Sequence, residues 1–254
     1  GEYNVGVGAY SLAANTTASN NTGVGYQALT ANTTGAGNTA LGNLTLAANT
    51  TANDNTAVGY NSLNDCTTGA SNVAVGTYAL DANTTASNNT AVGFHSLGKN
   101  TTGTSNASFG AYALNTATTA DNNTAVGYAA LDVNTTGDAN TGVGANAGGA
   151  VTTAYRGTFV GSGAFGAITT GHRNTALGYG CGGTGVTAYN CTLLGAECDV
   201  SASDANNQIV LGYDCTGSGN GTITCGEGTV DSTMTLGGTT WSAPSDVRMK
   251  EEVE

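Results

Sequence analysis

A five-residue motif, Asn-Thr-Ala-Val-Gly or a close variant, recurs every seventeen residues along this chain. Its glycine keeps that spacing from Gly8 to Gly212, and the residue before the glycine is apolar in every repeat. A period kept over so many repeats indicates stacked structural units, each of which contacts only its neighbours. The sequence therefore predicts an all-β fold, a β-solenoid (β-roll) of about thirteen 17-residue rungs.

The composition limits the possible partners. The chain has 254 residues, of which 40 are glycine and 9% are charged, and its net charge is -12. Five Lys and Arg residues cannot form the basic patch that binds phosphates, so we expect no nucleic-acid partner. No apolar run approaches the roughly 20 residues of a membrane span, so we expect no membrane insertion.

Alternation within the motif assigns side chains to the two faces of a short strand. Thr and Val share one face, and a column of small residues from Gly6 to Gly142 occupies the other. Such a column indicates close packing against another wall of the coil or against a neighbouring protomer. Leucines recur four residues after the glycines, from Leu12 to Leu131. We expect the Val and Leu columns to fill a narrow core, with Val58 and Leu63 inside. A charged residue substituted for Val92 would then be buried without a partner, which costs several kcal/mol.

Asparagine and threonine also keep the period. An asparagine precedes each of the first nine repeat glycines by four residues, from Asn4 to Asn140. Identical amides on successive rungs can bond to one another, so we expect Asn55 to stack on Asn38 and Asn72. Pairs of threonines between the leucine and the next asparagine indicate a turn.

The register divides the chain into four segments. Regular rungs cover 1–144, and degenerate, cysteine-containing rungs cover 145–216, where the leucine column is lost and the small column becomes larger. A Gly/Thr-rich β neck follows at 217–244. The last segment, 245–254, is rich in charge and lacks glycine, and we expect it to begin a helix after a proline and a Ser or Asp cap.

Three cysteines of the second segment share the repeat spacing. Cys181, Cys198 and Cys215 are each 17 residues apart, so they should stack about 5 Å from one another, within the range for a disulfide. Three cysteines cannot all pair within one chain, so one would stay free or bridge another chain. No Cys-x-x-Cys or Cys/His spacing indicates zinc. We favour disulfides or unreactive thiols, and predict no metal and no cofactor.

Catalytic patterns are weak. His95 and His172 are isolated in the sequence, and we expect both on the outer surface. Asp54, Asp121 and Asp138 fall near loop tips, which permits weak Ca²⁺ binding without arguing for it. The paired carboxylates of a glycan-cleaving enzyme are not evident. We therefore expect that this protein is not an enzyme.

The C-terminal segment carries a family resemblance. Ser-Asp-x-Arg-x-Lys-x-x-Val, from Ser245 to Val253, follows Trp241 and a short turn. It resembles the start of the endosialidase-type intramolecular chaperone domain of phage tail spikes, tail fibres and related trimeric proteins. The resemblance implies assembly of three chains and a single self-cleavage between Pro244 and Ser245, with Ser245 and Asp246 at the junction. The remainder of that domain is not in this chain.

The repeat carries a second resemblance. Asn-Thr-Ala-Val-Gly is similar to the Ser-Val-Ala-Ile-Gly repeat in the heads of trimeric autotransporter adhesins, which are left-handed β-rolls with shorter repeats. Both resemblances imply a homotrimer. We therefore expect a phage or virus tail-fibre shaft, located in the virion or on an extracellular surface, that attaches to a glycan or protein receptor of the host. The alternatives are a bacterial trimeric surface adhesin, an ice-binding β-solenoid, in which only one threonine of each Thr-Thr pair could face outward, and a glycan-cleaving tailspike.

Overall fold

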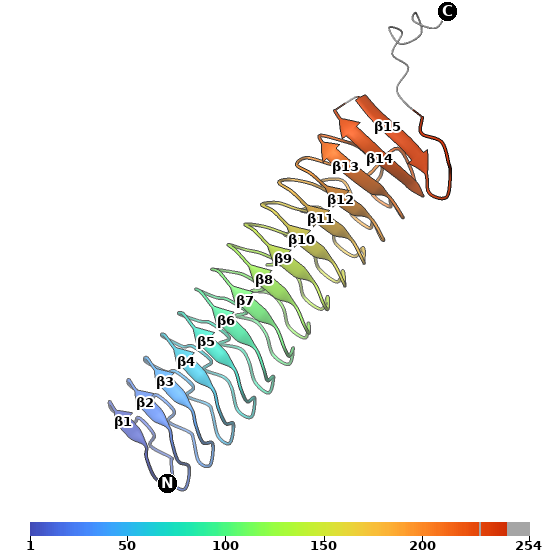
Figure 1. Ribbon diagram of the computed structural model, residues 1–254. Coiled ribbons are helices and arrows are strands. Elements are labelled where there is room, and N and C mark those ends of the chain that lie inside the picture. Colours follow the sequence, from blue (N-terminus) through green and yellow to red (C-terminus); the bar gives the residue numbers. More distant parts are fainter. Residues whose placement is uncertain (229, 243–254) are drawn as a thin grey trace, which may run out of the picture.

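The computed structural model describes residues 1–228 and 230–242, which form one long coil that ends in a β-hairpin. Each turn of the coil contributes one short strand, and the strands form a ladder along one side of the molecule (Figure 1). The strands are β1 (Val5–Val7), β2 (Thr22–Val24), β3 (Thr39–Leu41), β4 (Thr56–Val58), β5 (Val73–Val75), β6 (Thr90–Val92), β7 (Ala107–Phe109), β8 (Thr124–Val126), β9 (Thr141–Val143), β10 (Thr158–Val160), β11 (Thr175–Leu177), β12 (Thr192–Leu194), β13 (Ile209–Tyr213), β14 (Thr222–Glu227) and β15 (Val230–Thr235).

The strands pair in chain order, and β1 to β14 are parallel. From β1 to β13 the pairing is always between residues 17 apart, and Val58, for example, lies opposite Val75. Neighbouring strands lie about 4.8 Å apart, so the thirteen rungs extend over roughly 58 Å. The predicted all-β solenoid of about thirteen rungs is confirmed.

The core lies between the sheet and a wall of turns. The middle residue of the strand points inward, and Ala57 has no exposed surface. Leu63, from the turn wall, is also fully buried, as predicted. Val58 is only half-buried and faces outward, so its prediction as a core residue is wrong. In the regular rungs, a leucine from the turn wall leaves room only for alanine, glycine or serine from the strand wall.

The same correction applies to Val92, which occupies the equivalent half-buried outer position on β6. A charge at Val92 would reach water and would not be buried in the core. The small-residue column is therefore covered by the opposite wall of its own coil, one of the two explanations that the sequence left open.

The turn wall holds its leucines in a left-handed conformation. Leu63 has φ 52°, and the other leucines of its column have φ between 50° and 52°. This conformation costs a side-chain-bearing residue on the order of 1–2 kcal/mol, because Cβ approaches the following carbonyl oxygen. In the regular rungs this leucine is the one large fully buried side chain. Its burial offsets the cost.

Stacked asparagines join successive rungs, as predicted. The backbone N–H of Asn55 donates to the Asn38 side-chain oxygen at 3.0 Å, and the Asn72 N–H donates to the Asn55 oxygen at 2.9 Å. The Asn55 side-chain nitrogen donates to the Gly69 carbonyl at 2.9 Å. These buried amides form hydrogen bonds with backbone groups at the bend before each strand. The β-ladder provides no partners for those backbone groups.

A second asparagine column, which the sequence analysis did not separate, lies on the turn wall. The Asn49 side-chain nitrogen donates to the Asn32 oxygen at 2.9 Å. The column is interrupted at Cys66 and Ala117. The side-chain oxygens of Asn49 and Asn100, one rung before each interruption, are buried and have no hydrogen-bond partner.

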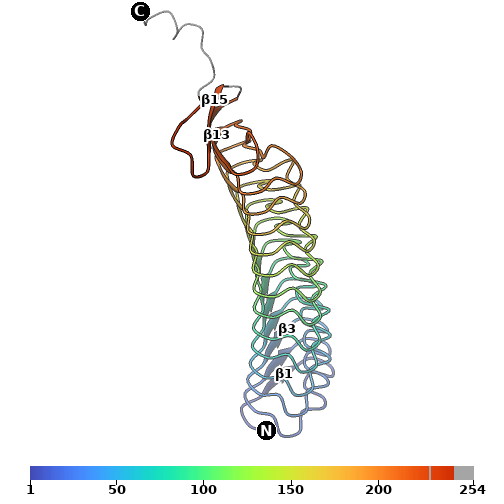
Figure 2. The ribbon, with the colours of Figure 1, turned by 90° about the vertical axis from the view of Figure 1, so that its right-hand side faces the viewer.

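The coil changes after rung nine and ends in a hairpin. Strand β14 continues the parallel ladder with an offset of 14 residues from β13, and β15 returns antiparallel to β14. Figures 1 and 2 show this hairpin at the far end of the ladder from the N-terminus. The predicted helix start at 245–254 lies outside the described residues. The described residues contain no helix of the length and apolarity that a membrane span requires.

Candidate functional site

Two surfaces of the coil differ from an ordinary soluble exterior. The first is the outward side of the sheet, formed by the first and third residues of β1 to β13, which we call the outer sheet face. These residues are mostly threonine in one column and Val, Leu or Phe in the other. They are half-buried or exposed, and Leu41, Leu177 and Leu194 retain 48%, 45% and 47% of their surface.

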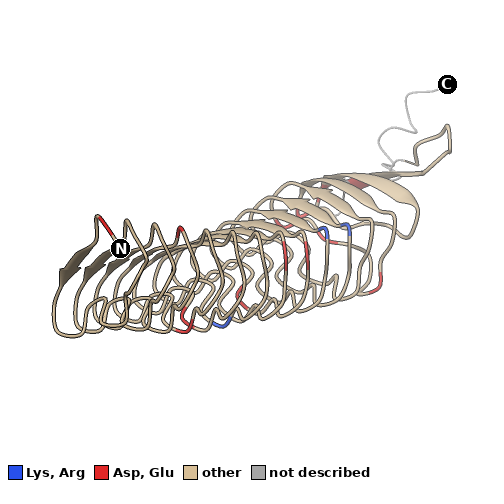
Figure 3. Cartoon of the chain, turned by 90° about the horizontal axis from the view of Figure 1, so that it is seen from below, with Lys and Arg blue, Asp and Glu red and all other residues tan. Residues whose placement is uncertain are grey.

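No charged residue lies in strands β1 to β13. Figure 3 shows that the charged residues of these rungs lie on the turns and not on the strands. The outer sheet face is therefore long, neutral and partly apolar, although the chain as a whole carries a net charge of -12. Contiguous exposed apolar surface of this kind marks interaction sites in soluble proteins.

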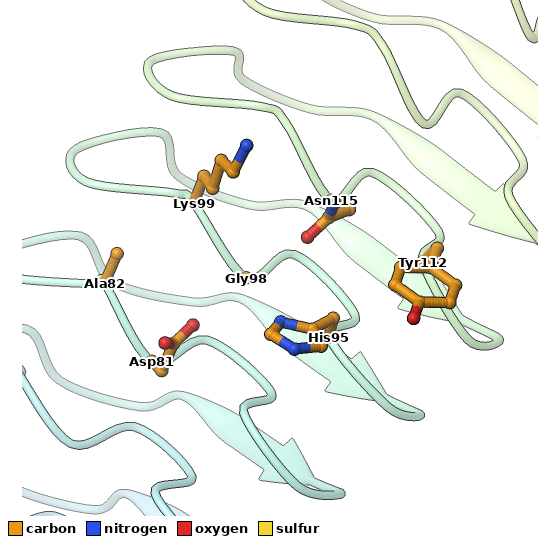
Figure 4. Close-up of a pocket in the computed structure, with 7 residues that line it drawn as sticks. All are labelled: Asp81, Ala82, His95, Gly98, Lys99, Tyr112 and Asn115. Carbon is orange, nitrogen blue, oxygen red and sulfur yellow. The ribbon is translucent and has the colours of Figure 1, made fainter.

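The second surface is a cleft of about 260 Å³ on the turn wall of rungs five to seven. We call it the corner cleft, and Figure 4 shows how its side chains surround Gly98. Its lining residues are Asp81, Ala82, His95, Gly98, Lys99, Tyr112 and Asn115.

The corner cleft has an aromatic side. The His95 imidazole stacks between Tyr78 and Tyr112, with ring centroids 4.8 and 5.9 Å away. Phe94 lies edge-on to His95 at 4.4 Å, and 42% of its surface is exposed. The stack exists because equivalent residues of consecutive rungs lie one above another. His95 is thus isolated in the sequence but not in the structure.

The opposite side of the corner cleft is polar. Burial raises the pKa of the Asp81 carboxyl above its ordinary value, and the charge of His95 opposes this increase. Burial likewise raises the pKa of Asp132, one rung above Asn115, while the Asn115 amide and the Lys99 ammonium lower it. One side-chain oxygen of Asp132 is buried without a hydrogen-bond partner. Carboxylate, amide and ammonium groups thus lie together around a small space.

Of the site residues predicted from the sequence, Ser245 and Asp246 fall outside the described residues, and the three cysteines lie in other rungs than this cleft. Cys181, Cys198 and Cys215 stack on successive rungs as fully buried free thiols. The backbone joins them through a Gly182 N–H···O bond to Cys198, and an Asp199 N–H···O bond to Cys215. Their disulfide pairing stays a prediction.

Two of the acidic loop residues, Asp121 and Asp138, accept hydrogen bonds from the backbone of the preceding rung. A side-chain oxygen of Asp121 accepts the Thr104 N–H at 2.6 Å, and one of Asp138 accepts the Asp121 N–H at 2.7 Å. Among the described residues no group of three or more His, Cys, Asp or Glu side chains is placed to hold a metal ion. The second histidine, His172, stacks between Tyr155 and Tyr189 at 4.7 and 5.7 Å.

Sequence reasoning missed the polar half of the corner cleft, although a signal was present. Aligning the chain by its period places Ala, Thr and Ala at the Asp81 position in the first three rungs, and Ala at the Lys99 position. Charged and amide side chains replace these residues only from the fourth to the eighth rung. They are Asn64, Asp65, Asp81, Lys99, Asn115 and Asp132.

Comparisons with protein-family models, with curated protein sequences and with solved structures find no match to this chain.

Proposed function

We propose that this chain is the shaft of a homotrimeric fibre that serves host attachment in a phage or virus tail. The observation that carries the proposal is the outer sheet face, a neutral stripe of Thr, Val and Leu along thirteen rungs. Burial of apolar surface contributes about 25 cal/mol per Å², so three such stripes facing a common axis would stabilise a trimer. The two family resemblances support the same assembly.

The shape of the coil suits a shaft. Each rung bonds only to its neighbours, and the chain can become longer without a larger core. Host attachment is the function that a fibre of this kind serves in the resembling families, through a glycan or protein receptor. A bacterial trimeric surface adhesin would use the same geometry, and it remains the alternative within this class.

Mass in solution tests the trimer. Sedimentation equilibrium should give three times the chain mass of 24.8 kDa. The double variant Val92→Asp/Val126→Asp places two charges on the outer sheet face, and it should convert the trimer into a folded monomer with an unchanged circular dichroism spectrum. Ala91→Asp, one residue from Val92, points into the core and should unfold the chain, because a buried unpaired charge costs several kcal/mol.

The control carries the same charges elsewhere. Thr85→Asp/Thr119→Asp adds two charges to exposed turns and should leave the trimer intact. A wild-type chain that is monomeric at micromolar concentration would reject the fibre shaft.

One observation favours a second function, ice binding. The sheet presents threonine and an apolar residue two positions apart on the same flat face, repeated at about 4.8 Å from rung to rung. This Thr-x-Val arrangement is a better ice-binding candidate than the Thr-Thr turns considered from the sequence. A monomeric wild type that lowers the freezing point below the melting point would establish it, and Thr56→Lys/Thr90→Lys should abolish that gap.

The self-cleavage proposal has its own test. The chain is expressed with the gene sequence that follows it, as wild type and as Ser245→Ala, and each product is run on a denaturing gel. Cleavage should release a shaft ending at Pro244 from the wild type alone. An uncut wild type that still forms a stable trimer would show that the chaperone resemblance does not extend to the chemistry.

A further inference from the structure

The corner cleft is the place where the chain departs from its own repeat. At the position of Gly98, the other rungs from the first to the eighth carry a side chain, and only this rung carries none. A Cβ at Gly98 would lie 3.0 Å from the Asn115 side-chain oxygen, 3.4 Å from the Asp81 oxygen and 3.4 Å from His95 Nδ1. Three polar side-chain atoms on three rungs therefore lie so close to Gly98 that a Cβ there would crowd them.

We propose that the corner cleft binds one pyranose ring of a neutral saccharide. A sugar hydroxyl both donates and accepts hydrogen bonds, and the cleft offers both partners at short range. The Asp81 carboxylate accepts, the Lys99 ammonium donates, and the Asn115 amide does both. The volume of about 260 Å³ is close to the lower end of small-molecule sites, which suits one ring.

Other ligand classes fit less well. An anion would meet the Asp81 carboxylate within the cleft and the nearby Asp132, one rung beyond Asn115, against the single Lys99 ammonium. A cation would meet Lys99, and the described residues hold no metal-binding group of three ligands. A wholly apolar ligand would leave the Asp81 carboxylate and the Asn115 amide without hydrogen-bond partners, which disfavours its binding.

The aromatic side of the cleft provides the apolar contact. A pyranose ring has C–H faces as well as hydroxyls, and it packs on the exposed edges and faces of aromatic rings. His95 and Tyr112 line the cleft, and Phe94 beside them is exposed. Tyr60 and Tyr128, further along the same corner, retain 43% and 58% of their surface. The corner thus continues the site along the fibre for further sugar units.

The biological meaning of this site rests on the proposed attachment function, but binding itself does not. The cleft is formed within one chain and lies on the turn wall, whereas the outer sheet face is on the strands. A folded monomer of Val92→Asp/Val126→Asp should therefore bind the same sugar. Loss of the trimer and loss of sugar binding can be separated.

The two histidines make nuclear magnetic resonance a direct test, because the chain has only His95 and His172. The probes are the methyl pyranosides of glucose, galactose, mannose and N-acetylglucosamine, with methyl glucuronide as the anionic comparison. At roughly millimolar concentration, at least one neutral probe should shift the ring signals of His95 and leave those of His172 unchanged.

Gly98→Ala is the decisive variant. The φ of Gly98 lies outside the left-handed region, so alanine adds no backbone strain there. Its methyl group crowds the Asn115, Asp81 and His95 atoms that line the cleft, and the affinity should fall at least tenfold. Gly183→Ala is the matched control at the equivalent rung position, where the nearest atom to a new Cβ is an Asp199 oxygen at 3.5 Å. Gly183→Ala should bind as the wild type does and keep the wild-type melting temperature, and both variants should keep the wild-type circular dichroism spectrum.

Three outcomes would overturn the proposal. They are no response of His95 to any neutral probe, equal responses of His95 and His172, and a response that Gly98→Ala leaves unchanged. Tighter binding of methyl glucuronide than of every neutral probe would overturn the neutral class. If the sugar binds as expected while the wild type is monomeric, the site stands and the fibre shaft fails.

Discussion

The first eight rungs fill the core with large side chains from the turn wall alone, whereas several later rungs also fill it from the strand wall. In the regular rungs a leucine such as Leu131 projects from the turn wall toward a small residue of the strand. At rung ten Phe159 projects from the strand wall instead, and the leucine position before it is Gly148. A Cβ at Gly148 would lie 2.7 Å from both the Leu131 side chain and the Phe159 ring. The core is filled in both regions, by a leucine of the turn wall in the regular rungs and by Phe159 of the strand wall at rung ten.

This difference shows that the side-chain volume in the core of a narrow solenoid stays the same, while the wall that supplies the large side chain can change. Interiors are close-packed, so a large residue from one wall requires a small one from the other. It also relieves strain, because Gly148 and Gly182 occupy with φ 61° and 79° the left-handed position that leucine occupies in the regular rungs. In the regular rungs, the burial of the leucine offsets the strain of its left-handed conformation.

The largest expected effect tests the exchange of walls. Phe159→Ala should lower the free energy of unfolding by about 3–5 kcal/mol, because it opens a cavity. Gly148→Leu alone should cost about 1–3 kcal/mol through collision with Phe159. The double variant should recover most of both losses, because it restores the regular arrangement. Denaturant titration of all four proteins gives the coupling free energy, and simple additivity of the two losses would contradict the exchange.

The second effect concerns the interrupted asparagine column of the regular rungs. Ala117→Asn should raise the free energy of unfolding by about 1–2 kcal/mol, because the new amide can donate to the unpaired oxygen of Asn100. Ala48→Asn introduces the same residue at a half-buried position outside the column and is the control. A gain for Ala48→Asn as large as that for Ala117→Asn would show that the column is not the cause.

The third effect separates the two regions by pH. Burial raises the pKa of Cys66 and Cys181 from 9.0 to about 11, and that of Cys215 to about 12. The unfolded thiols ionise near 9.0 and the folded ones do not. Their stabilising contribution is therefore complete below pH 9 and is lost as the pH rises toward 11 or 12.

Melting temperatures measured from pH 8 to pH 11 should therefore decline. Cys181→Ala/Cys215→Ala should flatten the decline more than Cys66→Ala, because two of the raised thiols lie in the later rungs. Equal slopes for all three proteins would contradict this origin of the alkaline instability.

The smallest effect is expected on the exposed turns. Thr85→Ala removes one exposed side chain of a Thr-Thr pair and should change the free energy of unfolding by about 0.5 kcal/mol or less. Thr84→Ala, its half-buried neighbour, loses a hydrogen bond from its hydroxyl to the Thr101 carbonyl at 3.2 Å and should cost more. The reverse order would mean that the two threonines exchange roles in solution.

The sequence by itself determined the period, the number of rungs and the columns that stack. Residues 17 apart share one environment, so Asn55 had to meet Asn38 and Asn72, and Leu63 had to join one line of leucines. It also placed Thr56 and Val58 on the same side of their strand, because side chains alternate along a strand.

Only the tertiary structure decided which side faces inward and which residues form the corner cleft. A period of two separates Ala57 from Val58 but does not say which is inside, because that depends on the width of the coil. The cleft likewise joins Asp81, Gly98 and Asn115, which are 17 residues apart and resemble scattered exceptions to the repeat in the sequence. Stacking brings these exceptions together. The Asp81 and Asn115 side chains reach Gly98 only because they lie one rung before it and one rung after it.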